Sequence, residues 1–243
     1  MIIFLRSLKR IYRLITLRPN INNITNDYDD YWDDVRGRDM GSLKVNSFQM
    51  FRALFISKEV SDSGSESLLD IGSGDGAVLN VIRKNFNGKI YATDISDNAL
   101  RALAKMGFDA LKFDINDAGN IDGLPVVDHI SILEVLEHMP NPELFLTNLM
   151  SNARKSIFFS IPNSGYFPYR IRLLLGSFPM QWVSHPGEHL RFWTYSDLVW
   201  WLEQLTISES SRIVGYEGIP VLNRLLPSLF SEGFIVKVEF ERP

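Results

Sequence analysis

The chain has 243 residues, of which 45% are hydrophobic and 22% charged; this is the length of one large or two small domains and the composition of an ordinary globular protein. It contains no cysteine, which excludes a disulfide scaffold, a thiolate metal site and a cysteine nucleophile. The 25 basic and 29 acidic residues give a net charge of −4, so the chain as a whole does not attract DNA or RNA, and no nucleic acid partner is expected.

The first nineteen residues form a basic segment with five basic side chains and no acidic one. Basic side chains interrupt its apolar runs too often for a signal peptide, and no later run has transmembrane length. On a helical wheel the apolar side chains gather opposite the basic ones. The apolar residues are Phe4, Leu8, Ile11, Tyr12 and Ile15, and the basic ones are Arg6, Lys9, Arg10 and Arg13.

This amphipathic pattern fits two roles. We favour a helix that flanks or covers the domain and keeps its basic face in solvent. The alternative is a helix that lies on an anionic membrane surface or grips a protein partner. We expect a cytoplasmic protein, which the second role would bring to the inner face of the membrane.

From residue 66 onward, short apolar runs alternate with helical patterns, as is typical of βαβ units and a parallel sheet. Five β-rich runs end in turn or capping residues, and these predicted strands are 67–71, 89–93, 110–113, 128–133 and 156–160. Four stretches have helical apolar spacing, and these predicted helices are 77–85, 97–106, 142–153 and 196–205. Segments 211–218 and 234–240 have the pattern of an antiparallel pair. We expect residues 1–26 to form the helix and a linker, and residues 27–243 one domain with a substrate-covering insertion at 164–192.

A glycine-rich turn follows the first predicted strand. The run Asp70–Ala77 contains Gly72, Gly74 and Gly76, and three glycines in five residues indicate that the backbone closely approaches a ligand. Asp94 ends the second strand, where a carboxylate can accept hydrogen bonds from both hydroxyls of a ribose. The run also satisfies the dinucleotide pattern G-x-G-x-x-A, so the pattern alone fits any nucleoside cofactor.

The acidic residues of this turn discriminate between cofactors. A dinucleotide would place its pyrophosphate beside Asp70 and Asp75, where each like-charge pair costs roughly 4 kcal/mol at ~4 Å and an effective dielectric of ~20. S-adenosylmethionine has no phosphate, its sulfonium and ammonium are cationic, and Asp70 can hold its amino-acid end directly or through water. The sequence therefore favours S-adenosylmethionine, and an NAD-dependent oxidoreductase is the less favoured alternative.

Further cofactor contacts are expected after the later strands, because open α/β sheets bind ligands at their carboxyl edge. Asp114 can accept a hydrogen bond from the adenine amino group, while Ile115 covers the ring. Ile95, after the second strand, and Glu134, after the fourth, complete the predicted contacts.

These motifs resemble those of the class I S-adenosylmethionine-dependent methyltransferases, from about residue 28 to the end of the chain. Asp94, Asp114, the glycine turn and the block Glu134–His138 stand at that family's spacing. Residues 160–191 are similar to the MetW-like branch, named for methionine biosynthesis, and the block Glu134–His138 to O-methyltransferases of quinone and RNA-end type. The resemblance implies a Rossmann-like α/β fold, with a seven-stranded, mostly parallel sheet, an antiparallel C-terminal hairpin and helices on both faces.

Methyl transfer is an in-line displacement, to which positioning contributes most. A hydroxyl acceptor with a high pKa also needs a group that removes its proton. His138, beside Glu137, is the leading candidate for this base, and His189 is the second. His185 is weaker, and His129, inside a strand, is expected to be buried and hydrogen-bonded.

The same block contains residues of the types that bind metal ions. Glu134, Glu137, His138 and His189 offer the oxygen and nitrogen donors that suit Mg²⁺ or Mn²⁺. The two glutamates can instead cap a helix, accept from neighbouring amides or help to hold the methionine moiety, so we assign no metal.

We predict a methyltransferase that uses S-adenosylmethionine and acts on a hydroxyl of a small molecule or glycan. The alternative is a non-catalytic MetW-like protein that binds S-adenosylmethionine and acts through a partner enzyme.

Overall fold

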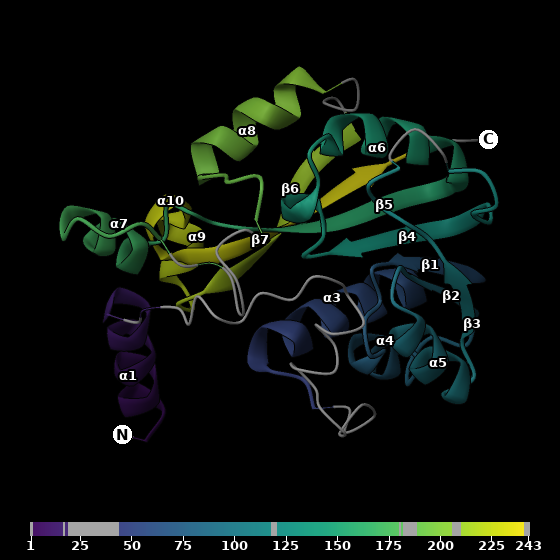
Figure 1. Cartoon of the computed structure of the whole chain (residues 1–243), viewed down its shortest axis with the longest axis horizontal. Coiled ribbons are helices and arrows are strands. Elements are labelled where there is room, and N and C mark those ends of the chain that lie inside the picture. The colour runs from purple at the N-terminus through teal and green to yellow at the C-terminus, as the bar shows by residue number, and fades with distance from the viewer. Residues whose placement is uncertain are drawn as a thin grey trace.

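The computed structural model describes residues 2–16, 18, 44–117, 121–179, 181, 189–205 and 210–240, with side chains from residue 8 onward. A seven-stranded sheet lies at its centre, with helices on both faces (Figure 1). The strand order is β3-β2-β1-β4-β5-β7-β6. This confirms the predicted Rossmann-like α/β fold with its antiparallel C-terminal hairpin.

The first five strands are parallel, and the last two run antiparallel to their neighbours. Strands buried on both faces read as continuous apolar runs, and this pattern made the central strands visible in the sequence. The strands are β1 (Ser67–Ile71), β2 (Lys89–Asp94), β3 (Asp109–Lys112), β4 (Val127–Leu133), β5 (Ala153–Pro162), β6 (Ser211–Gly218) and β7 (Ser231–Glu239).

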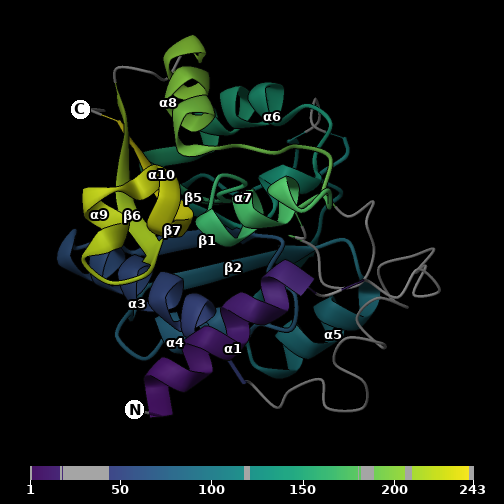
Figure 2. The same ribbon diagram turned by 90° about the vertical axis from the view of Figure 1, so that its left-hand side faces the viewer.

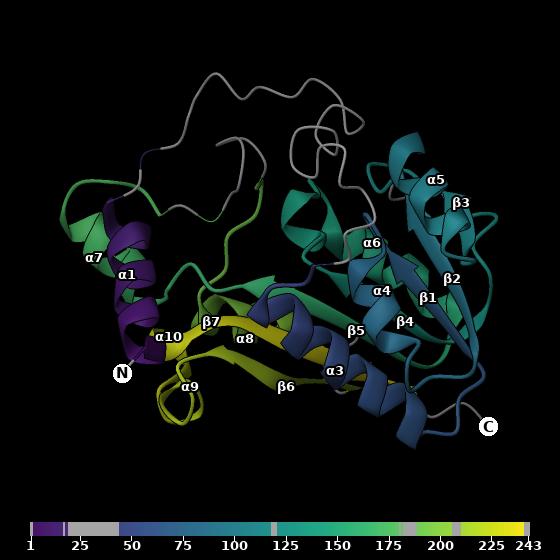
Figure 3. The same ribbon diagram turned by 90° about the horizontal axis from the view of Figure 1, so that it is seen from below.

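Two groups of helices cover the sheet. One face carries α3 (Ser47–Asp62), α4 (Ala77–Ile82) and α5 (Asp97–Lys105), and the other carries α6 (Pro142–Leu149) and α8 (Tyr195–Gln204) (Figures 1 and 3). Each group packs on its own cluster of buried apolar side chains. At one end of the molecule lie α1 (Ile2–Thr16), α7 (Phe167–Leu174), α9 (Leu222–Leu225) and α10 (Pro227–Phe230).

Most deviations from the predicted elements lie at their ends. The helix predicted at 142–153 stops at Leu149 and continues as a 3₁₀ turn, Met150–Asn152, because β5 begins at Ala153, earlier than expected. The helix predicted at 77–85 ends at Ile82. No element was predicted where α3 lies, although a reciprocal capping box at its start, between Asn46 and Gln49, is a signal that the sequence shows.

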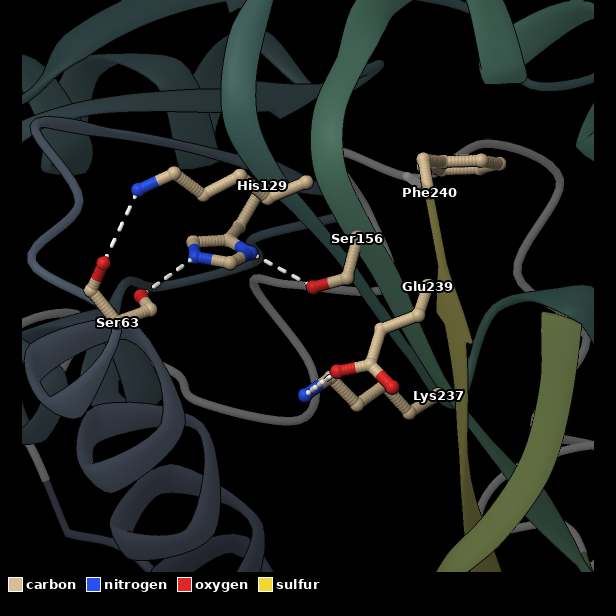
Figure 4. Close-up of a pocket in the computed structure, with 7 residues that line it drawn as sticks. Ser63, His129, Ser156, Lys237, Glu239 and Phe240 are labelled. Atoms are coloured by element: carbon tan, nitrogen blue, oxygen red, sulfur yellow. Dashed lines mark hydrogen bonds and ion pairs between the residues drawn. The ribbon is translucent and has the colours of Figure 1, made fainter. Parts of the chain in front are cut away.

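The amino-terminal edge of the sheet holds a polar cavity of about 420 Å³ (Figure 4). The Nε2 atom of His129 lies 2.9 Å from Ser63 Oγ and 2.7 Å from Ser65 Oγ, and its Nδ1 atom lies 2.7 Å from Ser156 Oγ. Lys155 donates to the carbonyl oxygen of Ser63 and to Ser65 Oγ. Both ring nitrogens of His129 are thus engaged, as its place inside a strand led us to expect.

His129 makes the stability of the fold sensitive to acid. Burial, assisted by the charge of Lys155, lowers the pKa of His129 to about 4 from 6.5. As the pH falls, the unfolded chain therefore protonates His129 before the folded protein does. Above about pH 6.5 the ring is neutral in both states and does not lower the unfolding free energy. Between pH 6.5 and pH 4 this free energy falls by at most roughly 3 kcal/mol.

We predict that the urea-unfolding free energy of the wild type falls more steeply between pH 7 and pH 4.5 than that of His129→Gln, which has no titrating ring. Equal slopes for the two proteins would contradict this assignment.

Candidate functional site

Four predicted site residues meet at the carboxyl edge of the sheet. Asp70 lies on β1, and Asp94, Asp114 and Glu134 end or follow β2, β3 and β4. These four strands are parallel neighbours, so they end at the same edge. The fold therefore gathers side chains that lie up to 64 positions apart, at the place where open α/β sheets bind ligands.

The glycine turn has a backbone that side chains disfavour. Gly72, Gly74 and Gly76 have φ angles of 70°, 55° and 74°. A Cβ atom on Gly72 would also lie 2.7 Å from a methyl carbon of Val135. The carboxylate of Asp94 accepts from the amide of Gly74 at 2.9 Å and from that of Ser96 at 3.0 Å, so the residue predicted to hold a ribose also fixes the turn.

Both acidic residues of the turn are buried. Asp70 accepts a hydrogen bond of 2.5 Å from Ser131 Oγ, and burial raises the pKa of Asp70 to about 6. Asp75 accepts from the amide of Ala77 at 3.2 Å. A bound phosphate would face two buried carboxyl groups, whereas a cationic ligand favours the ionised form of Asp70.

The predicted adenine contacts lie next along the same edge. Asp114 is exposed, and one of its oxygens accepts from the backbone and side-chain amides of Asn116 at 2.9 and 3.0 Å. Ile115 is half-buried and packs on the core, and Ile95 is half-buried after β2. The positions agree with the predicted contacts, and the roles remain predictions.

Glu134 has an unusual backbone, with a φ of 56°. L residues pay roughly 1–2 kcal/mol for this left-handed conformation, which is concentrated at functional sites. Its amide donates to Ser160 Oγ at 2.9 Å, and the same hydroxyl donates to Glu134 Oε1 at 2.8 Å. Its other oxygen, Oε2, lies 3.3 Å from Arg52 Nη2.

Arg52 is a site residue that the sequence analysis missed. It comes from α3, and its Nε and Nη2 atoms donate to the two carboxylate oxygens of Glu217 of β6 at 2.5 and 2.8 Å. Its side chain is 11% exposed and that of Glu217 only 2%. Burial opposes the charge of Arg52, but the carboxylates of Glu134 and Glu217 hold its pKa above the usual value. This buried ion pair joins α3, the end of β4 and the C-terminal hairpin.

A second cluster lies beyond Glu134, in and beside the 3₁₀ turn Leu136–His138. Glu137 is 1% exposed, and neither of its carboxylate oxygens has a hydrogen-bond partner among the described residues. Its Oε1 atom lies 4.0 Å from Nε2 of His138, whose ring centroid is 4.8 Å from that of His189. One donor atom from each of the three residues lies within 4.8 Å of the other two. We call these three residues the Glu-His-His cluster.

The electrostatics of the Glu-His-His cluster follow from its burial. Burial, and then the charge of Glu134, raise the pKa of Glu137 well above its usual value. Burial, and then the neighbouring His138, lower the pKa of His189 to about 3. The Nδ1 atom of His189 is buried, and the described part of the chain supplies no partner for it. A buried carboxyl group and two imidazoles thus converge, and among the described residues both oxygens of Glu137 and the Nδ1 atom of His189 have no hydrogen-bond partner.

Backbone hydrogen bonds bring the two distant parts of the cluster together. The carbonyl oxygen of Glu137 accepts from the amides of Leu190 at 2.7 Å and Arg191 at 3.1 Å. These bonds place His189, at the end of the predicted insertion, beside His138. The predicted base candidates are therefore neighbours, while His185 lies outside the described residues.

Glu134, the fourth residue of this region that could supply a metal ligand, does not lie with the three members of the cluster. Its carboxylate is bound by Ser160 and Arg52 instead.

Removal of Arg52 should strongly destabilise the protein. Arg52→Met leaves the buried carboxyl of Glu217 without its cation, and we expect a loss of about 3–5 kcal/mol in unfolding free energy. Arg52→Lys keeps the charge but not the two-point contact, so its loss should be smaller. Chemical denaturation checks both.

The control is Arg212→Met, which breaks the exposed pair between Arg212 and Glu239 and should cost less than about 1 kcal/mol. Similar losses for Arg52→Met and Arg212→Met would refute the importance of the buried pair.

Comparison with known proteins gives a consistent family and fold. Residues 49–205 match the family described as "Methyltransferase domain". No curated protein sequence matches the chain significantly.

Several solved structures are similar. The small RNA methyltransferase HEN1 is 22% identical, with a TM-score of 0.59 over 79% of this chain and 25% of that one, so this chain spans about a quarter of its length. A SAM dependent methyltransferase from Archaeoglobus fulgidus is 17% identical, with a TM-score of 0.55 over 79% of this chain and 97% of that one. The plantazolicin methyltransferase, solved in complex with SAH, is 16% identical, with a TM-score of 0.55 over 96% and 98%. At these identities, the likeness shows a shared fold.

Proposed function

Because the chain belongs to the family of class I methyltransferase domains, which use S-adenosylmethionine, we propose that it transfers a methyl group from this cofactor to a hydroxyl of a small molecule or glycan. The observation that supports an oxygen acceptor best is the Glu-His-His cluster at the carboxyl edge. The cluster follows β4, and Asp94, which we propose to hold the ribose, ends β2, two strands away in the sheet.

The cofactor contacts in this proposal follow the strand ends. Asp94 accepts from the ribose hydroxyls, and the glycine turn lets the backbone approach the nucleoside. Asp70 and Glu134 face the cationic methionine end, where their negative charge stabilises the ammonium group. Asp114 and Ile115 contact the adenine.

In this reaction the protein mainly positions the two reactants. The acceptor oxygen forms a bond to the methyl carbon while the carbon–sulfur bond breaks, and S-adenosylhomocysteine leaves. The hydroxyl proton must depart at the same time or before, and the Glu-His-His cluster supplies groups that can take it. His138 has the more accessible ring, with its side chain 25% exposed, and we assign it as the base. Glu137, whose Oε1 lies 4.0 Å from His138 Nε2, and His189, whose ring packs edge-on against that of His138, complete the proposed catalytic group.

The cluster also fits a divalent cation. A buried carboxylate that has no hydrogen-bond partner among the described residues and two imidazole nitrogens are a suitable oxygen and nitrogen donor set for Mg²⁺ or Mn²⁺. Glu137, His138 and His189 would be the ligands. When bound, such an ion would lower the pKa of an acceptor hydroxyl.

Cofactor binding is the first test. By calorimetry, S-adenosylmethionine and S-adenosylhomocysteine should bind with micromolar affinity and NADH should not. Gly74→Arg should abolish binding, because it fills the space above the turn.

A matched control is Gly64→Arg, since Gly64 also has a positive φ, of 59°, and has open space beside it. It carries similar backbone strain before the start of β1, at the opposite edge of the sheet, so the affinity should stay unchanged. Normal binding by the Gly74→Arg protein would refute the cofactor site.

The catalytic assignment predicts a separation of binding from turnover. His138→Ala should lower kcat by about 100-fold or more and leave the affinity for S-adenosylmethionine unchanged. Glu137→Gln should act in the same direction, whereas Glu203→Gln, on the exposed side of α8, should have no effect. The assay follows labelled methyl groups into a panel of lipids, sugars and quinones.

Chelation distinguishes the two modes of proton removal. Loss of activity with EDTA and recovery with Mg²⁺ or Mn²⁺ would assign the cluster to a cation, and full activity in EDTA would assign His138 as a direct base. If His138→Ala kept full activity while the protein worked only with a partner enzyme, the non-catalytic alternative would be correct.

A further inference from the structure

One end of the molecule presents apolar and basic side chains together. Figure 2 looks onto this end, where α1, α7, α9 and α10 lie side by side although they are far apart in sequence. We call the exposed side chains of residues 8–16, 18, 170–178 and 221–226 the basic apolar face.

The apolar side chains of this face are unusually exposed. Leu174 and Leu175, at the end of α7, are 86% and 69% exposed, and Phe178 is 58% exposed. Val221 and Leu225, in and before α9, are 69% and 70% exposed. A single exposed leucine is ordinary, but a group of large apolar side chains at one end of a protein marks an interaction surface.

The same segments carry basic side chains and no acidic ones. Residues 1–19, 163–179 and 218–231 contain eight basic residues and no acidic one, in a chain whose net charge is −4. Six of the eight are exposed, namely Lys9, Arg10, Arg13, Arg18, Arg170 and Arg224. The two flanking acids, Glu217 and Glu232, are held by Arg52 and Arg10, with side chains only 2% and 14% exposed.

The position of α1 corrects one expectation about its apolar side. Ile11, Leu14 and Ile15 are partly covered, whereas Leu8 and Tyr12, predicted on the same side as Ile11, are 46% and 68% exposed. The helix therefore packs on the domain with only part of its apolar surface. Leu8 and Tyr12 are exposed, as are Lys9 and Arg13.

Direct contacts hold the three segments together. Arg172 of α7 donates to the carbonyl oxygen of Ile15 at 2.9 Å, and Arg10 of α1 pairs with Glu232 of β7. Arg170 of α7 donates to Ser228 Oγ of α10 at 2.8 Å. The basic apolar face is thus part of the folded domain and does not depend on a free helix.

From this combination, we infer that the basic apolar face binds the surface of an anionic lipid membrane. Apolar side chains that enter the lipid interface, surrounded by basic side chains that meet anionic headgroups, are the pattern of proteins that lie on membranes. A second copy of the chain would oppose basic residues to basic residues. Among the described residues no helix is long and apolar enough to cross a bilayer, so the contact would be peripheral.

The face adjoins the proposed catalytic edge. Residue Phe167 begins α7 soon after β5 ends at Pro162, and Pro162 pairs with Gly233, next to the Glu232 that binds Arg10. A protein bound through this face would therefore hold the carboxyl edge of its sheet close to the membrane. The inference itself does not rest on the proposed methyl transfer.

The test is co-sedimentation of the full chain with vesicles. At about 50 mM salt, the protein should sediment with phosphatidylcholine vesicles that contain phosphatidylglycerol and not with phosphatidylcholine alone, and 0.5 M salt should release it. Lys9→Glu with Arg13→Glu should weaken binding at least about tenfold, since each basic residue near the surface contributes roughly fivefold. Leu174→Ser with Leu175→Ser should weaken it about tenfold.

Matched controls lie on other elements. Arg101→Glu with Lys105→Glu changes two exposed basic residues of α5, and Val126→Ser with Leu144→Ser changes two exposed apolar ones. Both controls should bind like the wild type, and circular dichroism verifies that every variant folds.

Three results would overturn the inference. They are no binding to either vesicle, equal binding to neutral vesicles, and equal losses in the face and control variants. A dimer in sedimentation velocity that only the face variants dissociate would assign the face to a second copy instead.

Discussion

The carboxyl edge of the sheet gathers acidic side chains, and Arg52 is the cation that holds three elements together there. Its guanidinium contacts Glu217 at two points and Glu134 at a third, and the side chains of Arg52 and Glu217 have little exposure to solvent. Buried carboxylates are costly without such a partner, because water no longer stabilises their charge. Since Arg52 comes from α3 and Glu217 from the C-terminal hairpin, the proposed cofactor site depends on a contact between the two ends of the domain.

The two edges of the sheet use buried polar groups differently. At the amino-terminal edge, His129 has hydrogen bonds on both ring nitrogens, and burial lowers its pKa, so the ring is neutral near pH 7. At the carboxyl edge, Glu137 and the Nδ1 atom of His189 are buried with no hydrogen-bond partner in the described structure. Buried polar groups with hydrogen-bond partners contribute to stability. Buried polar groups without partners lower the stability of the fold, and they are found where a ligand or a reaction uses them.

The N-terminal helix connects the site with the surface. Arg10 reaches Glu232 at the start of β7, and the charge of Arg10 opposes the effect of burial, which raises the pKa of Glu232 to about 7. The flanking role that we favoured for this helix agrees with its packing on α7. Its basic side chains remain outside, so covering the domain and meeting an anionic surface are compatible roles for one helix.

Much of the fold and of the candidate cofactor site could be predicted from the sequence, because local interactions determine it. The strand periodicity, the glycine turn and the spacing of Asp70, Asp94 and Asp114 follow from backbone sterics and from the regular βαβ repeat, which act over a few residues. The helix α3 was missed although its capping box is local, so that omission was avoidable. The tertiary structure alone decided that Arg52 binds Glu217, that Glu134 separates from the Glu-His-His cluster, and that His189 joins His138 across about fifty residues. These contacts depend on how distant segments close over the sheet, and loop closure has no period or spacing that a sequence could display.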